Sequence, residues 1–138
     1  MPELYQGRSI AKGVAEGEVL VTTQPLSFFG GVDPDSGLIT ERGHELFGVN
    51  VSGKVLVLPP LKGSTASTWI ICRLSEKGVA PSAIIIKKAD IILIAGAIIG
   101  KIPTVDNFDF DPTTKFKTGE KLRVNGNKGT VEVISEGR

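Results

Sequence analysis

The chain has 138 residues, of which 41% are hydrophobic and 22% are charged. This composition excludes a wholly disordered protein, and the length predicts one domain over residues 1–138. The 16 basic and 15 acidic side chains leave a net charge of +1, without the basic excess that is typical of nucleic-acid binders.

The counts of cysteine and histidine exclude further classes of protein. Cys72 is the only cysteine, so no internal disulfide can form, and His44 is the only histidine. One thiolate and one imidazole are too few ligands for a structural zinc site or an iron–sulfur cluster held by this chain alone. We therefore expect no metal and no cofactor on this chain.

Signals for export or for a membrane are also missing. The N-terminus has no basic segment followed by an apolar core, so no signal peptide is predicted. The most apolar run, residues 91–99, is much shorter than the roughly 20 residues that a membrane span needs. We expect a cytoplasmic protein that binds neither membranes nor nucleic acid.

The predicted elements begin with a strand over residues 15–23, where polar and apolar residues alternate. Three glycines and Pro34 then make a turn-rich loop of residues 30–37. A short β-branched strand follows over residues 54–58 and stops at Pro59 and Pro60. The first half of the chain is therefore expected to consist of short elements joined by tight turns.

The clearest helix comes next, over residues 64–77. Ser64 or Thr65 can cap its N-terminus with a side-chain oxygen, and Gly78 suits the position after its end. Apolar residues recur here at helical spacing, and they are Ala66, Trp69, Ile70 and Leu74, widened by Ile71 and Cys72. We therefore expect a largely buried helix with Trp69 and an inert Cys72 on its core face.

The second half of the chain is predicted to be mostly strands. Residues 83–87 form an apolar run without alternation, which is typical of a strand covered on both faces. Further strands are expected over residues 90–94, 102–105, 120–124 and 130–134, with a short helical turn at 95–100. Asn125-Gly126 is a strong hairpin signal between the last two strands. The whole indicates an α/β domain, mostly β, with one dominant helix.

The segment between the second strand and the helix is the best candidate for chemistry. A helix N-terminus presents unpaired N–H groups and the positive end of the helix dipole, which suit an anion. The residues that add charge, backbone space or hydroxyl groups here are Lys62, Gly63, Ser64, Thr65 and Ser67. They predict an anion site with an activated Ser64. They also fit a plain helix cap with surface hydroxyl groups, and the spacing matches neither a P-loop nor a nucleophile elbow.

The glycine-rich loop before Pro34 is a second candidate. Gly30 and Gly31 permit close approach of the backbone, and Asp33 can bind a ligand or a partner chain. The alternative is a plain turn that Asp33 itself caps. His44 is a further candidate for the same site or interface loop, although a lone histidine is more often structural than catalytic.

A run of alternating acidic and aromatic residues lies near the C-terminal end. Three aspartates between residues 106 and 111 resemble a loose cation site. The two phenylalanines interleaved with them indicate instead a surface segment that is pinned by aromatic rings. Both interpretations stay open at the level of the sequence.

Four segments in order along the chain resemble the small subunit of the aconitase X family. They are Gly30-Gly31-Val32-Asp33-Pro34, Lys62-Gly63-Ser64-Thr65, Ala80-Pro81-Ser82-Ala83-Ile84-Ile85 and Gly96-Ala97-Ile98-Ile99-Gly100-Lys101-Ile102-Pro103. The resemblance spans residues 7–106, and it is specific because several motifs occur in register. Family members usually continue Gly-Ser-Thr with Val-Gly-Ser, where this chain has Ala66-Ser67-Thr68.

The resemblance implies a fold, a partner and an activity. The fold is a swivelling β/β/α barrel-like domain, as in the mobile last domain of aconitase. The partner is a large subunit that carries an iron–sulfur cluster, expected to be of the 4Fe-4S type. Together the two subunits remove water from a small hydroxy acid, here expected to be phosphorylated. The serine that accepts the proton in the family falls on Ser64.

Two alternatives to this function remain at this stage. The first is the small subunit of a cis-3-hydroxy-L-proline dehydratase, which would share the architecture but act on a zwitterion without phosphate. The second is a non-catalytic swivelling binding module in which Ser64 only caps its helix.

Overall fold

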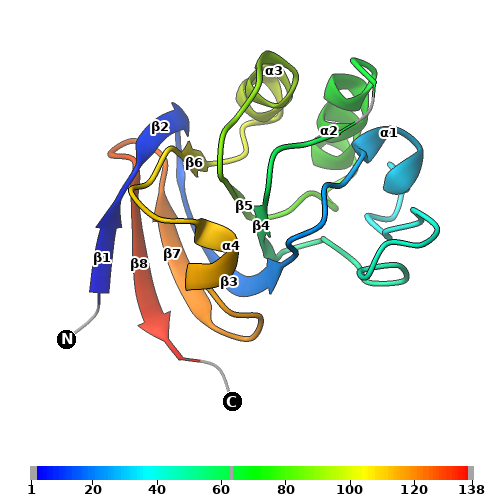
Figure 1. Cartoon of the computed structure of the whole chain (residues 1–138). Helices are drawn as coiled ribbons and strands as arrows, with labels where there is room; N and C mark the ends of the chain where they lie inside the picture. The colour runs from blue at the N-terminus through cyan, green and yellow to red at the C-terminus, as the bar shows by residue number, and fades with distance from the viewer. Residues whose placement is uncertain (1–2, 63, 137–138) are drawn as a thin grey trace.

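The computed structural model describes residues 3–62 and 64–136 as a mixed α/β architecture, mostly strands, and confirms the predicted fold class (Figure 1). The strands are β1 (Glu3–Gln6), β2 (Arg8–Ala11), β3 (Val14–Val21), β4 (Val55–Leu58), β5 (Ala83–Ile86), β6 (Thr104–Asp106), β7 (Lys121–Asn125) and β8 (Thr130–Ser135). The helices are α1 (Phe28–Gly31), α2 (Ser67–Glu76), α3 (Ile91–Gly100) and α4 (Pro112–Lys115).

The eight strands of the described residues form one sheet in the order β1-β8-β7-β3-β4-β5-β6-β2. The strands from β3 to β6 run parallel, and antiparallel neighbours flank them on both sides. β1 and β2 follow each other directly in the chain, yet they occupy opposite edges. The sheet therefore curls until its edges approach (Figure 1), but no ladder joins β1 to β2, so the barrel-like shape is not closed.

Two apolar cores lie on the two faces of the curled sheet. Successive side chains of β4 and β5 alternate between them, because neighbouring residues of a strand point to opposite faces. The outer core, under α2 and α3, contains Leu56, Leu58, Ile84 and Ile86, and the inner core contains Val55, Val57, Ala83 and Ile85. Both strands are buried along their whole length, which confirms the prediction of a strand covered on both faces.

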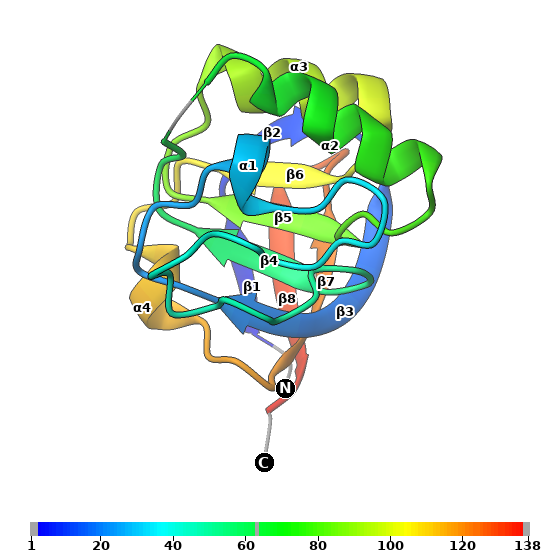
Figure 2. The same ribbon diagram turned by 90° about the vertical axis from the view of Figure 1, so that its right-hand side faces the viewer.

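α2 and α3 lie side by side over the outer core (Figure 2). Thr68 donates its hydroxyl hydrogen to the carbonyl oxygen of Ile92 at 2.8 Å, near the start of both helices. One turn later Gly96 packs so closely on Ile71 that a Cβ atom there would lie 3.0 Å from Cβ of Ile71. The helices therefore run parallel in close contact. No helix in the described part of the chain is long and apolar enough to cross a membrane.

The prediction of a strand over residues 90–94 is wrong, because these residues open α3. Consecutive isoleucines favoured a strand. Asp90 overrides this preference as N-cap, where its side chain accepts the N–H of Leu93 at 2.9 Å, and Lys101 ends the helix with φ at 58°. The layer thus holds two ten-residue helices rather than one dominant helix.

The prediction that Trp69 lies in the core is also wrong, because its side chain is 77% exposed. α2 turns Ser67, Ile71 and Leu74 toward the sheet instead. Residues 69–72 are all apolar, so helical periodicity did not fix which side of the helix faces inward. Cys72 is half-buried. Burial is the larger cause, and the nearby Glu76 carboxylate the smaller cause, of the raised pKa of its thiol.

An aromatic cluster closes the inner core. The ring of Phe116 is 1% exposed and meets the rings of Tyr5, Phe108 and Phe110 edge to face, with centroids 5.8, 6.4 and 6.0 Å away. Phe108 and Phe110 stack on each other at 5.0 Å. The structure therefore favours the aromatic interpretation of this segment.

The aspartates of the same segment have separate structural contacts. Asp106 is fully buried and accepts two hydrogen bonds from the Arg8 guanidinium, at 2.9 and 2.8 Å. Asp111 begins α4, where its side chain accepts the N–H of Thr113 at 3.0 Å. Within residues 3–62 and 64–136, no group of three or more His, Cys, Asp or Glu side chains could hold a metal ion.

Candidate active site around Ser64

Ser64 lies in a tight turn between β4 and α2. Its carbonyl oxygen accepts the N–H of Ser67 at 3.0 Å, and its Oγ accepts the N–H of Ala66 at 3.0 Å. α2 therefore begins at Ser67, with Ala66 at the N-cap position, and neither Ser64 nor Thr65 is the N-cap. Ser64 and Thr65 are both exposed, which leaves the Ser64 hydroxyl accessible in front of the helix.

A small hollow of about 40 Å³ lies in front of this turn. Its lining combines Leu61, Lys62, Ser64 and Ser67 from the segment after β4 with Asp90 and Ile92 from the segment after β5. β4 and β5 are adjacent parallel strands, and the loops at the carboxyl ends of such strands are the usual place for ligands in α/β folds. Gly63 lies outside the described residues.

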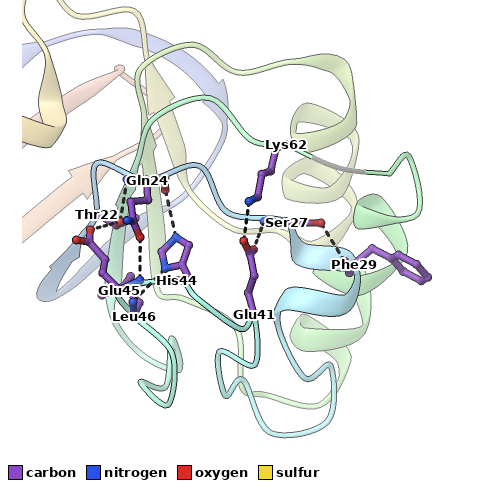
Figure 3. A network of polar contacts seen from close by, with 9 residues as sticks. All are labelled: Thr22, Gln24, Ser27, Phe29, Glu41, His44, Glu45, Leu46 and Lys62. Carbon is purple, nitrogen blue, oxygen red and sulfur yellow. Dashed lines mark hydrogen bonds and ion pairs between the residues drawn. The ribbon is translucent and has the colours of Figure 1, made fainter.

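Lys62 forms an ion pair with Glu41 (Figure 3). The Lys62 Nζ lies 2.7 Å from Glu41 Oε2, and the N–H of Ser27 donates to Glu41 Oε1 at 3.0 Å. Burial alone raises the pKa of Glu41, but the hydrogen bonds from Lys62 and Ser27 outweigh it, so this pKa lies below its ordinary value. Glu41 therefore stays ionised, and the charge of Lys62 is largely compensated in this arrangement.

Gly31 makes room for this ion pair. A Cβ atom on Gly31 would lie 2.9 Å from Glu41 Oε1, so a larger residue would push this carboxylate out of its position. Gly30 has φ at 82°, a conformation that other residues rarely adopt. The close approach predicted for these glycines occurs at Gly31, where it serves a side chain of the same chain, and not at Gly30.

Ser67 ties α1 to α2. It is 2% exposed, and its Oγ accepts the N–H of Phe29 at 3.2 Å. The hydroxyl of Ser27 in turn donates to the Phe29 carbonyl oxygen at 2.9 Å (Figure 3). These bonds link the Lys62–Glu41 pair to the start of α2, so the loops around the hollow form one connected network.

Asp33 and His44 both bind their own loops. Asp33 accepts the N–H of Asp35 at 3.1 Å and the hydroxyl of Ser36 at 2.7 Å, and these two bonds, led by Ser36, lower its pKa. The Nδ1 of His44 accepts the N–H of Leu46 at 3.0 Å. The ring hydrogen therefore sits on Nε2, which faces the Gln24 carbonyl oxygen at 3.3 Å (Figure 3).

The structure brings only part of the predicted set together at one hollow. Lys62, Ser64 and Ser67 line it, whereas His44 joins Lys62 in a neighbouring hollow of about 280 Å³. Asp33 binds the turn that follows it.

Sequence reasoning missed Glu41 and Asp90. An acidic residue in a loop gives no sign of the lysine that it will meet, because the two are 21 positions apart in the chain. Asp90 could have been found as the N-cap of a second helix, had the isoleucine run been assigned to α3.

The arrangement can stabilise an ionised hydroxyl. The N–H of Ala66 and the positive end of α2 both face the Ser64 oxygen, and both favour a negative charge there. Asp90 lies across the same hollow and can accept a hydrogen bond from a ligand hydroxyl. These groups fit a hollow that receives a polar, hydroxylated ligand.

Known proteins resemble this chain over nearly its whole length. A family model described as the aconitase X swivel domain matches residues 4–133. The phosphomevalonate dehydratase small subunit of Pyrococcus furiosus is 47% identical over 132 residues, which cover 96% of each chain. The protein of the same name from Methanosarcina mazei is 42% identical over 137 residues, or 99% of this chain and 95% of the relative. The crystal structure of Thermococcus kodakaraensis aconitase X in its holo form has a TM-score of 0.91 at 44% identity, covering 96% of this chain and 99% of the other.

Proposed function

Because the chain belongs to the aconitase X swivel-domain family, we propose that it is the small subunit of a phosphomevalonate dehydratase of the archaeal mevalonate pathway. This hydro-lyase converts (R)-5-phosphomevalonate to trans-anhydromevalonate 5-phosphate and water. One observation carries the proposal: relatives with this name match nearly the full length of both chains at 42–47% identity.

Ser64 is the proposed proton acceptor. Its alkoxide takes the proton from the carbon next to the substrate carboxylate, and the electron pair of that C–H bond forms the new C=C bond. The hydroxyl on the neighbouring carbon leaves as hydroxide, which takes up the proton from Ser64 and becomes water, so the alkoxide is regenerated. The alkoxide is costly in water, but the N–H of Ala66 at 3.0 Å and the start of α2 lower that cost.

The other residues of the loop bind and orient the substrate in this proposal. Lys62 and Thr65 are the residues proposed to bind its carboxylate and phosphate, whereas Ser67 is 2% exposed and holds Phe29 in place. A bound anion competes with Glu41 for Lys62, since the two lie 2.7 Å apart in the free chain. The N–H of His44 holds Glu41 by donating to its carbonyl oxygen at 3.2 Å, whereas Gly30, Gly31 and Asp33 shape the neighbouring turn.

A large subunit completes the site and holds the iron–sulfur cluster of the enzyme in this proposal. The residues of this chain do not fit a cluster, because its one cysteine is a half-buried thiol on α2 and no group of three potential ligands occurs among the described residues. The chain therefore supplies half of a shared site.

The proposal is tested by steady-state kinetics of the two-subunit complex with Ser64→Ala. This variant keeps Lys62 and the backbone donors but removes the base. We expect kcat for 5-phosphomevalonate to fall by about two to four orders of magnitude, the usual range for general acid–base catalysis, while assembly is unchanged.

Ser67→Ala is the matched control, because it removes a hydroxyl from the same hollow. Its hydroxyl accepts the N–H of Phe29, so its loss should lower the melting temperature but reduce kcat less than about tenfold, well below a general-base effect. A Ser64→Ala complex that turns over within about threefold of the parent would place the base elsewhere.

A further inference from the structure

α3 is apolar around its whole circumference. Its ten residues, IILIAGAIIG, include no charged or polar side chain. One side is buried against the rest of the chain, but Ile91, Ile98 and Ile99 on the other side are 80%, 54% and 66% exposed. A helix that is hydrophobic on all sides is normally buried on all sides. The outer side of α3 therefore has the composition of a covered surface.

α2 extends this surface at one end. Trp69 is exposed, and it follows Thr68, which is hydrogen-bonded to Ile92 at the start of α3. In Figure 2 the two helices form the top layer of the molecule, with no other element above them. We name this surface the outer stripe and define it as Trp69, Ile91, Ile98 and Ile99. Exposed tryptophan and large aliphatic side chains on one face are typical of the centre of a protein interface.

The far end of the outer stripe is hollowed on both sides of α3. One hollow of about 450 Å³ is lined by Ile99 and Cys72, and another of about 340 Å³ by Ile98 and Lys12. Lys101 lines both hollows, and neither Lys101 nor Lys12 forms an ion pair within residues 3–62 and 64–136. Glu76 also lines the larger hollow, so we expect acidic partner groups only at the smaller one, where Lys12 and Lys101 lie, and apolar side chains at both.

We propose that the outer stripe docks the large subunit of the dehydratase. This inference rests on the proposed function, and continuity with the site identifies the occupant. Ile91 lies between Asp90 and Ile92, and both of these line the hollow of Ser64. A subunit that completes the hollow covers this end of α3, and the apolar surface continues from there along the helix. One interface thus buries the mouth of the site and the outer stripe together.

The test is the affinity of the full chain for the purified large subunit, measured by isothermal titration calorimetry. Ile99→Glu places a carboxylate in the apolar surface at the far end of the stripe. We expect the dissociation constant to rise about thirtyfold or more, as for the loss of an interface hot spot. The melting temperature of the chain alone should not change, because Ile99 is mostly exposed. Ile98→Glu is the second variant and should act in the same direction.

Leu4→Glu is the matched control. Leu4 is 67% exposed, as Ile99 is 66% exposed, but it lies in β1, away from α2 and α3 (Figure 1). It should leave the affinity unchanged. Binding of Ile99→Glu within about threefold of the parent, or equal weakening by Leu4→Glu, would overturn the inference. The inference would also be overturned if the parent chain used Ile99 to self-associate or to bind lipid vesicles while the large subunit bound elsewhere.

Failure of the proposed function has a different signature. A complex whose assembly depends on Ile99 but that does not dehydrate 5-phosphomevalonate would retain the docking surface and refute the substrate. An active complex whose two subunits bind equally well with Ile99→Glu would support the substrate and refute the docking surface.

Discussion

The inner aromatic cluster and the outer stripe show two fates of large apolar side chains in one small chain. Phe116 and its neighbours close the inner core ring against ring, and nothing outside the chain is needed to cover them. Trp69 and the outer isoleucines of α3 meet solvent instead. Hydrophobicity alone does not separate these cases. Position does, because the exposed set begins beside the hollow of Ser64.

The largest expected effect on the chain alone is that of Phe116→Ala. Loss of a buried ring that touches three others should destabilise the fold by about 3–5 kcal/mol. Trp69→Ala removes a larger ring but one that is exposed, so it should change stability by no more than about 0.5 kcal/mol. Urea unfolding of both variants measures the difference. Equal destabilisation by the two variants would contradict this difference between a buried ring and an exposed one.

A smaller effect is expected from Glu41→Gln, and it should depend on pH. The pKa of Glu41 is lower in the folded chain than its ordinary value, so its stabilisation is complete above that ordinary value, about 4.3, and is lost as the pH falls through the folded value. The parent should therefore melt at a higher temperature than Glu41→Gln at pH 7. The gap should shrink as the pH falls below that ordinary value.

Thermal melts across this range test the role of the Lys62–Glu41 pair. Asp35→Asn is a control, since Asp35 forms exposed ion pairs with Arg73 and Lys77 far from the hollow. It should change the melting temperature little. A gap between parent and Glu41→Gln that widens in acid would mean that the pair does not stabilise the loop.

The sequence predicted well those elements that local patterns determine. The β7–β8 hairpin follows from Asn125-Gly126, and the buried β5 follows from its run of isoleucines. α3 was missed because its isoleucines favour a strand, and only the cap at Asp90 and the contact of Gly96 with α2 favour the helix. β1 and β2 were not predicted, since short exposed strands acquire their order from partners more than 90 residues away.

The candidate site also combines features that the local sequence determines with features that only the folded chain determines. The sequence predicted Ser64 between a strand and a helix, and the structure has it there, although α2 begins three residues later, at Ser67. The burial of Ser67, the pairing of Lys62 with Glu41 and the presence of Asp90 depend on loops that meet only in the folded chain. The prediction for Trp69 is wrong for a related reason. An apolar side chain can pack in the core or against a partner, and the sequence around it has the same pattern in both cases.

The most direct test of the central claim is reconstitution. The purified chain and the large subunit are assayed separately and together for release of trans-anhydromevalonate 5-phosphate from (R)-5-phosphomevalonate, with cis-3-hydroxy-L-proline as the competing substrate. We predict no turnover by either subunit alone, turnover by the mixture, and a clear preference for the phosphorylated substrate. Turnover by the small chain alone, or a mixture that dehydrates hydroxyproline but not phosphomevalonate, would contradict the account.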